Sequence, residues 1–364
     1  MRTIAMMMMT MMSSTSTSTT VILVNKDDKQ QPNKNKAQHS NACLTRSNSI
    51  ALLQAETPKE KILYWFAGLL VGVAVCAFAV TFPLYLFPTA AVPTYQAAGY
   101  VYEAAKESHF DNTAWTYSTD YLIAIAMVYQ MLRFPRVTSN NAVLTWRSKA
   151  LLASYAASVV CGGVCHQYYT ALEQRNTWHF RVLWTCCVGS VTAGVAMLGA
   201  IATELVRQDE ILGLAFVPAL PGWFWCGVGT TTTAACAAGY FSYQRPACDI
   251  FVAGVAQSIP TFYLMATLWR GLPTFASIDR WTRVAGLIAF IMMSATLPSY
   301  PLAVQYSGWS LGTVNALLHV WLCAAWSAQG VTLRRIATAL ALPATATYIP
   351  VKKDRSSSSN KKVA

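Results

Sequence analysis

Long apolar runs separated by short polar segments occupy most of this chain. Between residues 62 and 335, apolar windows of about 18 residues, close to the length of helix that crosses a bilayer, recur along the sequence. The predicted spans are residues 63–87, 120–132, 150–172, 180–204, 222–243, 250–269, 284–304 and 311–329. This pattern predicts an all-α fold: a polytopic bundle of about eight transmembrane helices, with one amino-terminal span followed by a seven-span core.

Polar segments enclose this apolar region and divide the chain into three parts. Residues 1–61 are rich in Ser, Thr, Asn, Gln and Lys, and cannot bury enough apolar surface to offset the entropy lost on folding. We therefore expect a disordered cytosolic tail at 1–61, a transmembrane domain at 62–335 with its core at 115–335, and a basic cytosolic tail at 336–364. A cleaved targeting peptide is the alternative for the amino terminus, although the usual Arg-rich pattern is missing.

Composition supports a membrane protein and argues against a nucleic-acid-binding protein. Hydrophobic residues make up 54% of the chain and charged residues only 12%, whereas a soluble domain carries about 25% charged residues. The net charge of +12 is spread over tails and loop ends, so anionic membrane lipid, and not nucleic acid, is the expected partner. Most of the ten cysteines fall inside apolar spans, where they act as small packing residues.

The distribution of Lys and Arg predicts the orientation, because cytosolic loops carry an excess of positive charge. With a cytosolic amino terminus, the inner loops hold Arg133, Arg136, Arg147, Lys149, Arg207, Arg270, Arg280 and Arg283. The outer loops then hold only Lys106, Arg175, Arg181 and Arg245. Both termini are therefore predicted to be cytosolic.

The last residues of the chain resemble an address signal. Lys361 and Lys362 stand fourth and third from the carboxyl end, as in the dilysine signal that returns multi-pass proteins to the endoplasmic reticulum. Such a signal is bound by a retrieval receptor and does not anchor the protein. It requires a cytosolic tail, which agrees with the predicted orientation, so the endoplasmic reticulum is the expected location.

Ionisable and polar groups within the spans gather toward the predicted outer face. Asp120 opens the second span, Ser158 and His166 lie on the third, and Asn315 and His319 lie in the outer half of the last. Ionisable residues at membrane depth are costly and usually functional, so these five are the candidate catalytic residues. Helix packing and single structural hydrogen bonds are the alternative explanation.

Two imidazoles and a carboxylate suggest a specific chemistry. His166, His319 and Asp120 are donors that Zn²⁺ binds, and three protein ligands leave one position for an activated water. The same groups without a metal could relay protons or bind a polar headgroup. Zinc is therefore one candidate cofactor, and a metal-free site is the other.

The core also resembles a superfamily of seven-span membrane hydrolases and receptors. That superfamily includes the alkaline ceramidases, the progestin and adiponectin receptors and the enzymes that remodel the lipid of glycosylphosphatidylinositol anchors. The resemblance rests on Asp120 near the first core span, a serine and His166 on the second, and His319 on the last. It implies zinc-dependent hydrolysis of a lipid amide or ester. The chain departs from the family pattern in two places, where Gly162 replaces a serine and Asn315 replaces a histidine.

Three classes of function remain open from the sequence. The first is a lumen-facing lipid hydrolase or lipid-modifying enzyme, the second a transporter or proton-coupled carrier, and the third a non-catalytic receptor or scaffold. A retinal protein is excluded, because no lysine that could form the Schiff base occurs between Lys149 and Lys352. The sequence leaves the substrate and the oligomeric state open.

Overall fold

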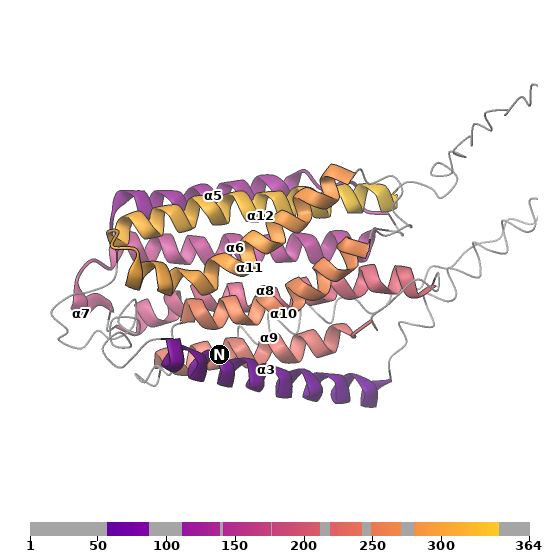
Figure 1. The fold of residues 1–364 in the computed structure, drawn as a ribbon, viewed down its shortest axis with the longest axis horizontal. Helices are drawn as coiled ribbons and strands as arrows, with labels where there is room; N and C mark the ends of the chain where they lie inside the picture. Colours follow the sequence, from indigo (N-terminus) through magenta and orange to yellow (C-terminus); the bar gives the residue numbers. More distant parts are fainter. Residues whose placement is uncertain are drawn as a thin grey trace, which may run out of the picture. The chain divides into compact units, whose positions relative to one another are not determined.

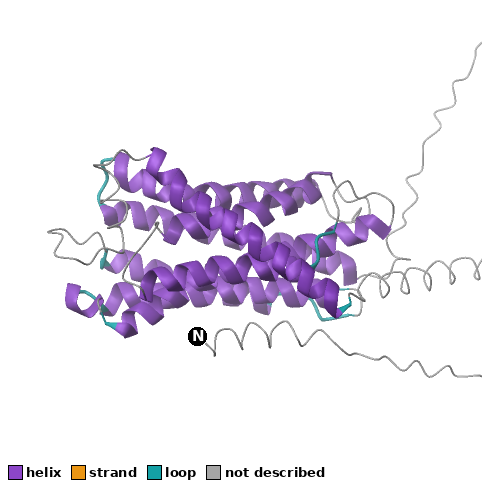
Figure 2. Cartoon of the chain, turned by 90° about the horizontal axis from the view of Figure 1, so that it is seen from below, coloured by secondary structure: helices purple, strands orange, loops and turns teal. Residues whose placement is uncertain are grey.

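A computed structural model describes residues 57–86, 111–138, 141–175, 177–211, 219–241, 249–270 and 280–341. Every regular element in these ranges is a helix (Figure 2), which confirms the all-α prediction. The helices are α3 (Pro58–Leu86), α5 (Ala114–Leu132), α6 (Ala142–Tyr168), α7 (Leu172–Arg175), α8 (Trp178–Ile211), α9 (Gly222–Phe241), α10 (Asp249–Arg270), α11 (Arg280–Tyr306) and α12 (Leu311–Ala341).

The ends of the helices differ from the predicted domain boundaries. Helix α3 begins at Pro58, inside the predicted tail 1–61, and α12 continues past the predicted boundary at 335 to Ala341. Nearly all of both predicted tails, including Lys361 and Lys362, lies outside the described residues.

A capping box explains where α3 begins. The Glu60 carboxylate accepts a hydrogen bond from the Thr57 backbone N–H at 2.7 Å, and the Thr57 hydroxyl accepts one from the Glu60 N–H at 3.3 Å. Pro58 follows Thr57, and proline suits the first helical position because the missing N–H has no helical partner there. The predicted start missed this signal because hydropathy alone does not detect caps.

Removing this cap gives the first prediction. Thr57→Ala is expected to destabilise the first turn of α3 by about 1 kcal/mol, raising amide exchange at Glu60 about fivefold. Hydrogen exchange measured by mass spectrometry on the full-length protein in detergent would detect the change. Thr57→Ser keeps the hydroxyl and should exchange like the wild type. Equal exchange in all three proteins would show that the box does not hold the helix end.

Among the described helices, six pack in a closed ring, and α3, α9 and the short α7 lie outside it. Around the ring, α5 contacts α6, α6 contacts α8, α8 contacts α10, α10 contacts α11, α11 contacts α12, and α12 contacts α5. Outside the ring, α9 packs on α8, and α3 packs mainly on α9 (Figure 1). Helix α3 is thus peripheral to the ring, and the candidate site lies in the ring.

Close backbone approach joins α3 to α9. A Cβ atom at Gly68 would overlap the backbone oxygen of Phe224, and one at Gly227 would overlap that of Trp65. One turn further, Gly72 faces the side chain of Thr231, 2.6 Å from where a Cβ would lie. Small residues spaced by four let two helices come into contact along their backbones, which is a common packing mode in membranes.

Four of the helices are long and apolar enough to cross a membrane. They cover Pro58–Ala79, Ala142–Tyr168, Trp178–Arg207 and Gly312–Ala341, and Val252–Leu268 is a shorter apolar stretch within α10. These findings, which concern the described residues only, indicate an integral membrane protein. Helices also occupy the other predicted spans, but the described parts of α5, α9, α10 and α11 do not meet the same criterion of length and apolar character, so the predicted number of about eight spans is not confirmed.

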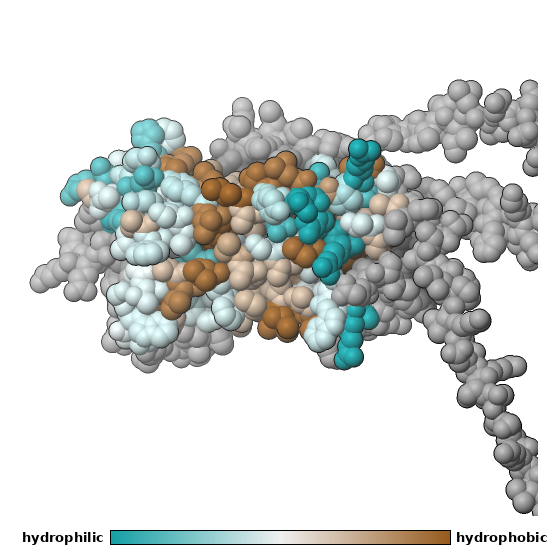
Figure 3. Space-filling view, turned by 90° about the horizontal axis from the view of Figure 1, so that it is seen from above, coloured by the Kyte–Doolittle hydropathy of each residue, from teal (hydrophilic) through white to brown (hydrophobic). Residues whose placement is uncertain are grey.

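The surface of the helices agrees with a lipid environment. Large apolar side chains are exposed on α3, α5 and α12, including Leu70, Ile125 and Val320. Seen from the side of α5 and α12, apolar patches occupy the middle of the surface, with hydrophilic residues toward its ends (Figure 3). Exposed apolar surface of this extent is unfavourable in water and favourable in contact with lipid.

Candidate functional site

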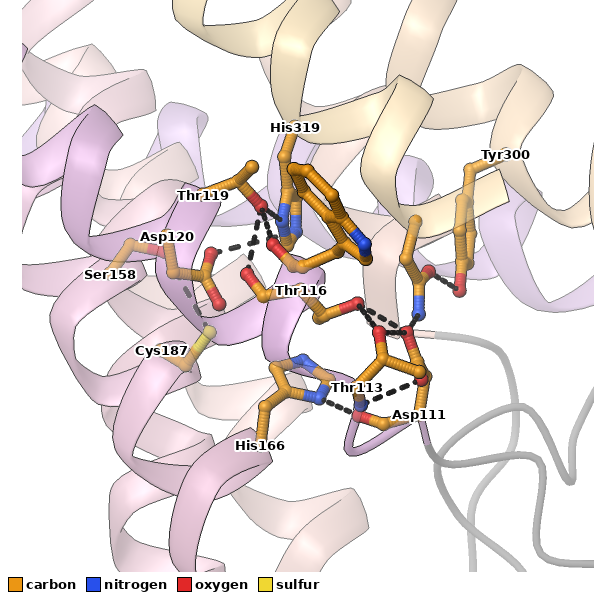
Figure 4. A network of polar contacts seen from close by, with 12 residues as sticks. Asp111, Thr113, Thr116, Thr119, Asp120, Ser158, His166, Cys187, Tyr300 and His319 are labelled. Carbon is orange, nitrogen blue, oxygen red and sulfur yellow. Dashed lines mark hydrogen bonds and ion pairs between the residues drawn. The ribbon is translucent and has the colours of Figure 1, made fainter. Parts of the chain in front are cut away.

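The structure brings Asp120 of α5 and His319 of α12 together. Asp120 Oδ1 lies 3.5 Å from His319 Nε2, and both residues are buried, with 3% and 8% of their surface exposed. They come from adjacent helices of the ring, and Figure 4 shows the two side chains facing each other. We call Asp120 and His319 the acid–base pair.

A hydroxyl lies on the other side of the same imidazole. Thr119 Oγ1 is 2.9 Å from His319 Nδ1, so His319 stands between a hydroxyl and a carboxylate (Figure 4). Thr119 Oγ1 also lies 2.7 Å and 2.8 Å from the backbone oxygens of Trp115 and Thr116. A hydroxyl has one proton, so Thr119 donates to the imidazole or to one of these carbonyls, but not to both at once.

One oxygen of the Asp120 carboxylate lies in a cradle made by two glycines. Asp120 Oδ2 is buried and has no hydrogen-bond partner among the described residues. A Cβ at Gly162 would lie 3.5 Å from this oxygen, and one at Gly163 would lie 3.2 Å from the Asp120 Cβ. The glycines of α6 thus leave the space that the carboxylate fills. An unpaired buried carboxylate oxygen is costly, which is typical of a functional site.

His166 of α6 provides a second imidazole near the acid–base pair. The ring centroids of His166 and His319 are 6.5 Å apart. His166 Nδ1 lies 2.5 Å from the backbone oxygen of Asp111, and because a carbonyl only accepts, Nδ1 carries the proton. In the neutral ring, Nε2 is therefore the basic nitrogen.

The Asp111 carboxylate anchors the segment that leads into α5. It accepts hydrogen bonds from the Thr113 N–H at 3.0 Å, from the Thr116 hydroxyl and from Asn315 Nδ2 at 3.3 Å. Burial alone would raise the pKa of Asp111, but these hydrogen bonds outweigh it and hold the pKa below its usual range. Asn315 in turn accepts a hydrogen bond from the Tyr300 hydroxyl at 2.6 Å.

Asn112 fixes the same segment to the end of α6. Its amide donates to the backbone oxygen of His166 at 2.6 Å, and its side-chain oxygen accepts from Arg175 at 2.9 Å. Arg175 also donates to the backbone oxygens of Tyr169 and Thr170, at 2.8 Å and 2.6 Å. These bonds satisfy carbonyls at the carboxyl end of α6 and fix the segment before α5 to it.

Two of the five predicted residues lie beside the acid–base pair without bonding to it. Ser158 is buried on α6, and its hydroxyl is 3.8 Å from the thiol of Cys187 on α8. Asn315 contacts Asp111 and Tyr300, one turn before His319. Among the hydrogen bonds of the described residues, none joins Ser158 or Asn315 to the acid–base pair. A direct catalytic role predicted for these two residues has no geometric support here.

The positions of the donor atoms bear on the predicted zinc site formed by His166, His319 and Asp120. The Asp120–His319 separation suits two ligands of one ion, since bonds of about 2.1 Å at tetrahedral angles place donors about 3.4 Å apart. Two imidazoles on such an ion would have centroids about 5.2 Å apart, less than the 6.5 Å between His166 and His319. Within the described ranges, no group of three or more His, Cys, Asp and Glu side chains is arranged to hold a metal ion. This arrangement therefore fits a two-residue acid–base pair better than a three-ligand zinc site.

Comparison with protein-family models, curated proteins and solved structures finds no match for this chain. The assignment of the site therefore depends on its geometry.

Two residues of the site did not emerge from the sequence as functional candidates. Thr119 directly precedes Asp120, but a threonine in a helix is common and its contact with His319 spans 200 positions. Asp111 lies just before α5, where its bond to the Thr113 N–H forms an Asx turn. The sequence Asp111-Asn112-Thr113 before a helix carries this turn signal, but it gives no sign of the contact to His166.

The low pKa of Asp111 predicts a pH dependence. The stability that its ionised form contributes is complete above the usual pKa of about 3.9 and is lost as the pH falls through the lower folded value. Thermal unfolding of the full-length protein in detergent between pH 7 and pH 3 would measure this effect. The wild type should be more stable than Asp111→Asn at pH 7, and the difference should shrink below pH 4. A constant difference over this range would contradict the proposed role of the carboxylate.

Proposed function

We propose that this protein is a membrane enzyme that cleaves an ester or amide bond of a lipid, with His319 as the general base and Asp120 as its partner. The observation that supports this proposal is the position of the His319 imidazole between the Thr119 hydroxyl and the Asp120 carboxylate. The hydroxyl–imidazole–carboxylate arrangement recurs in hydrolases of unrelated folds and is recognised by geometry, not by sequence order.

The protonation states follow from the hydrogen-bonding capacities of the groups. The mechanism requires an ionised Asp120, which only accepts; a neutral His319 then carries its proton on Nε2, and Nδ1 is the base. When Nδ1 takes a proton from a hydroxyl or water, the new imidazolium is stabilised by the carboxylate 3.5 Å away. At this step the positive charge of the imidazolium stabilises the buried Asp120 carboxylate beside it.

The surroundings of the site favour a lipid as substrate. Around Thr119, the exposed face of α5 carries Trp115 and Leu122, which expose 75% and 57% of their surface. Exposed apolar side chains of α12, among them Val320, lie next to the buried His319. An acyl chain can lie along these apolar side chains while its carbonyl group reaches the acid–base pair from the bilayer.

The location is part of the same proposal. About eight transmembrane helices and two cytosolic termini would place the acid–base pair toward the outer, lumenal side, as the distribution of Lys and Arg predicts. Retrieval through Lys361 and Lys362 would keep the enzyme in the endoplasmic reticulum. No step of the mechanism requires a metal ion.

A panel of fluorescent lipids tests this function. The full-length protein in lipid nanodiscs would be incubated with labelled phosphatidylcholine, diacylglycerol and ceramide, and released fatty acid would be measured. His319→Gln is expected to lower turnover of the preferred lipid by about 10²–10⁴, the usual contribution of a general base. His179→Gln is the matched control, because His179 is exposed at the start of α8 and lies outside the site. Absence of turnover with all three lipid classes, or full activity of His319→Gln, would refute the proposal.

One observation favours proton-coupled transport as a second candidate. Further along α5 and α12, the side-chain oxygens of Gln130 and Gln329 and the indole nitrogen of Trp326 are buried and have no partner among the described residues. Buried polar groups of this kind usually bind water, and water could extend a proton path from the acid–base pair. In proteoliposomes enclosing a pH-sensitive dye, such a carrier would conduct protons, and Gln329→Leu would reduce the rate. Unchanged internal pH under an imposed gradient would exclude this alternative.

A further inference from the structure

We propose that Thr119 is the nucleophile of the site and carries the acyl group of the lipid as a covalent ester during turnover. This inference rests on the proposed lipid-cleaving function and deepens it. A hydrolase with a histidine base can use either water or a side-chain hydroxyl as nucleophile, and Thr119 is the hydroxyl that contacts the base.

The contacts of Thr119 suit this role. Its Oγ1 is 2.9 Å from His319 Nδ1, within the reach expected between a nucleophile and its base. In the ionised state that the proposed mechanism requires, Asp120 favours the His319 tautomer with its proton on Nε2, and Nδ1 then accepts the Thr119 proton. Among the described residues, Thr119 is the one whose hydroxyl hydrogen-bonds to His319.

The helix backbone positions the hydroxyl. The backbone oxygens of Trp115 and Thr116 lie 2.7 Å and 2.8 Å from Thr119 Oγ1 and accept its proton whenever it is not donated to His319. A threonine is already restricted about χ1, so little rotamer freedom is lost when it is held there.

Thr119 is more accessible than Ser158, which the sequence indicates as a candidate catalytic residue. Thr119 is half-buried, between the exposed residues Trp115 and Leu122 on the face of α5. Ser158 is buried, with 3% of its surface exposed, and its hydroxyl contacts Cys187. A lipid carbonyl group that enters from the bilayer can therefore reach Thr119 more readily than the buried Ser158.

The proposed reaction has two balanced halves. Thr119 Oγ attacks the carbonyl carbon while its proton moves to His319 Nδ1, and the tetrahedral intermediate then collapses. The bond from the acyl carbon to the lipid alcohol or amine breaks, the leaving group takes the proton from Nδ1, and an acyl-threonine ester remains. Water then attacks this ester with its proton passing to Nδ1. Release of the fatty acid returns that proton to Thr119.

A long-chain alkyl fluorophosphonate tests the inference, with the full-length protein in lipid nanodiscs. Attack by Thr119 would form an oxygen–phosphorus bond and release fluoride, and peptide mass spectrometry would locate the adduct on the segment containing Thr119. Labelling should disappear in Thr119→Val and slow by at least about a hundredfold in His319→Gln, while Thr119→Ser should still be labelled. Ser118→Ala removes the neighbouring exposed hydroxyl and should react like the wild type.

Lipid turnover by the same proteins distinguishes failure of the proposed nucleophile from failure of the proposed function. Turnover that persists in Thr119→Val but is lost in His319→Gln would overturn the threonine nucleophile and leave the proposed function standing. Loss of turnover and labelling in Thr119→Val, with both retained in Thr119→Ser, would support the inference. A wild type that neither turns over lipid nor reacts with the probe would overturn both the inference and the function.

Discussion

Replacing Asp120 by asparagine is expected to reduce lipid turnover by about 10²–10⁴ without reducing the stability of the fold. Asparagine has nearly the same shape, so it fills the space above Gly162 and Gly163. It cannot stabilise an imidazolium at His319, and its amide nitrogen can donate to the ring and favour the wrong tautomer. The loss should therefore appear mainly in kcat, because the carboxylate acts on the developing charge and not on substrate binding.

Stability provides the complementary measurement for Asp120→Asn. A buried carboxylate with an unpartnered oxygen costs more than a buried amide, so the unfolding temperature should stay constant or rise. Functional sites often trade stability for activity in this way. Glu173→Gln is the control, because this carboxylate is exposed on α7. If Asp120→Asn unfolded the protein while retaining specific activity per folded molecule, Asp120 would be structural.

Replacing Gly227 by leucine is expected to separate α3 from α9 and to have the largest effect on assembly of the helices. Even a Cβ at this position would overlap the backbone oxygen of Trp65 and lie 2.8 Å from the Leu69 nitrogen. Backbone atoms cannot move aside as a flexible side chain can, so the two helices would have to part. The cost should be several kcal/mol, in the range of overpacked helix interfaces.

Thermal unfolding and cross-linking would detect this separation. A cysteine pair placed across α3 and α9 should cross-link in the wild-type background and fail to do so with Gly227→Leu. Gly222→Ala is the matched control on the same helix, because the nearest atom to its added Cβ is 3.9 Å away, in the Arg147 side chain. Because the acid–base pair lies in the ring and not on α3, lipid turnover by the folded fraction should be less affected than its stability. An undisturbed cross-link in Gly227→Leu would contradict the observed packing.

The hydropathy pattern predicted where helices occur, whereas the predicted number of membrane spans is not confirmed. Each predicted span overlaps a helix of the structure, because an apolar run of this length is stable in lipid only when its backbone groups bond within the helix. Helix ends were less well predicted. The start of α3 depends on the capping box at Thr57, and α12 continues through Arg334 and Arg335 to Ala341, where charged residues suit a helix that leaves the apolar region.

The sequence could identify only those site residues whose burial costs free energy. Asp120, His166 and His319 stood out because ionisable groups are rare inside apolar spans, and the structure places all three near one another. Thr119 and Asp111 did not stand out. A threonine has no such cost, and Asp111 lies outside the predicted spans, so only their positions in space show their contacts with the two histidines.

The sequence by itself therefore determined the helical class, the apolar surface and the ionisable groups that have to be buried, since these follow from the transfer of each residue between water and lipid. The tertiary structure alone decided which of these groups meet. The closed ring joins α5 to α12, although the two helices lie far apart in the sequence, and so sets His319 between Thr119 and Asp120. Contacts between distant helices depend on packing geometry, such as the space left by Gly162 and Gly163, and no local pattern of hydrophobicity specifies them.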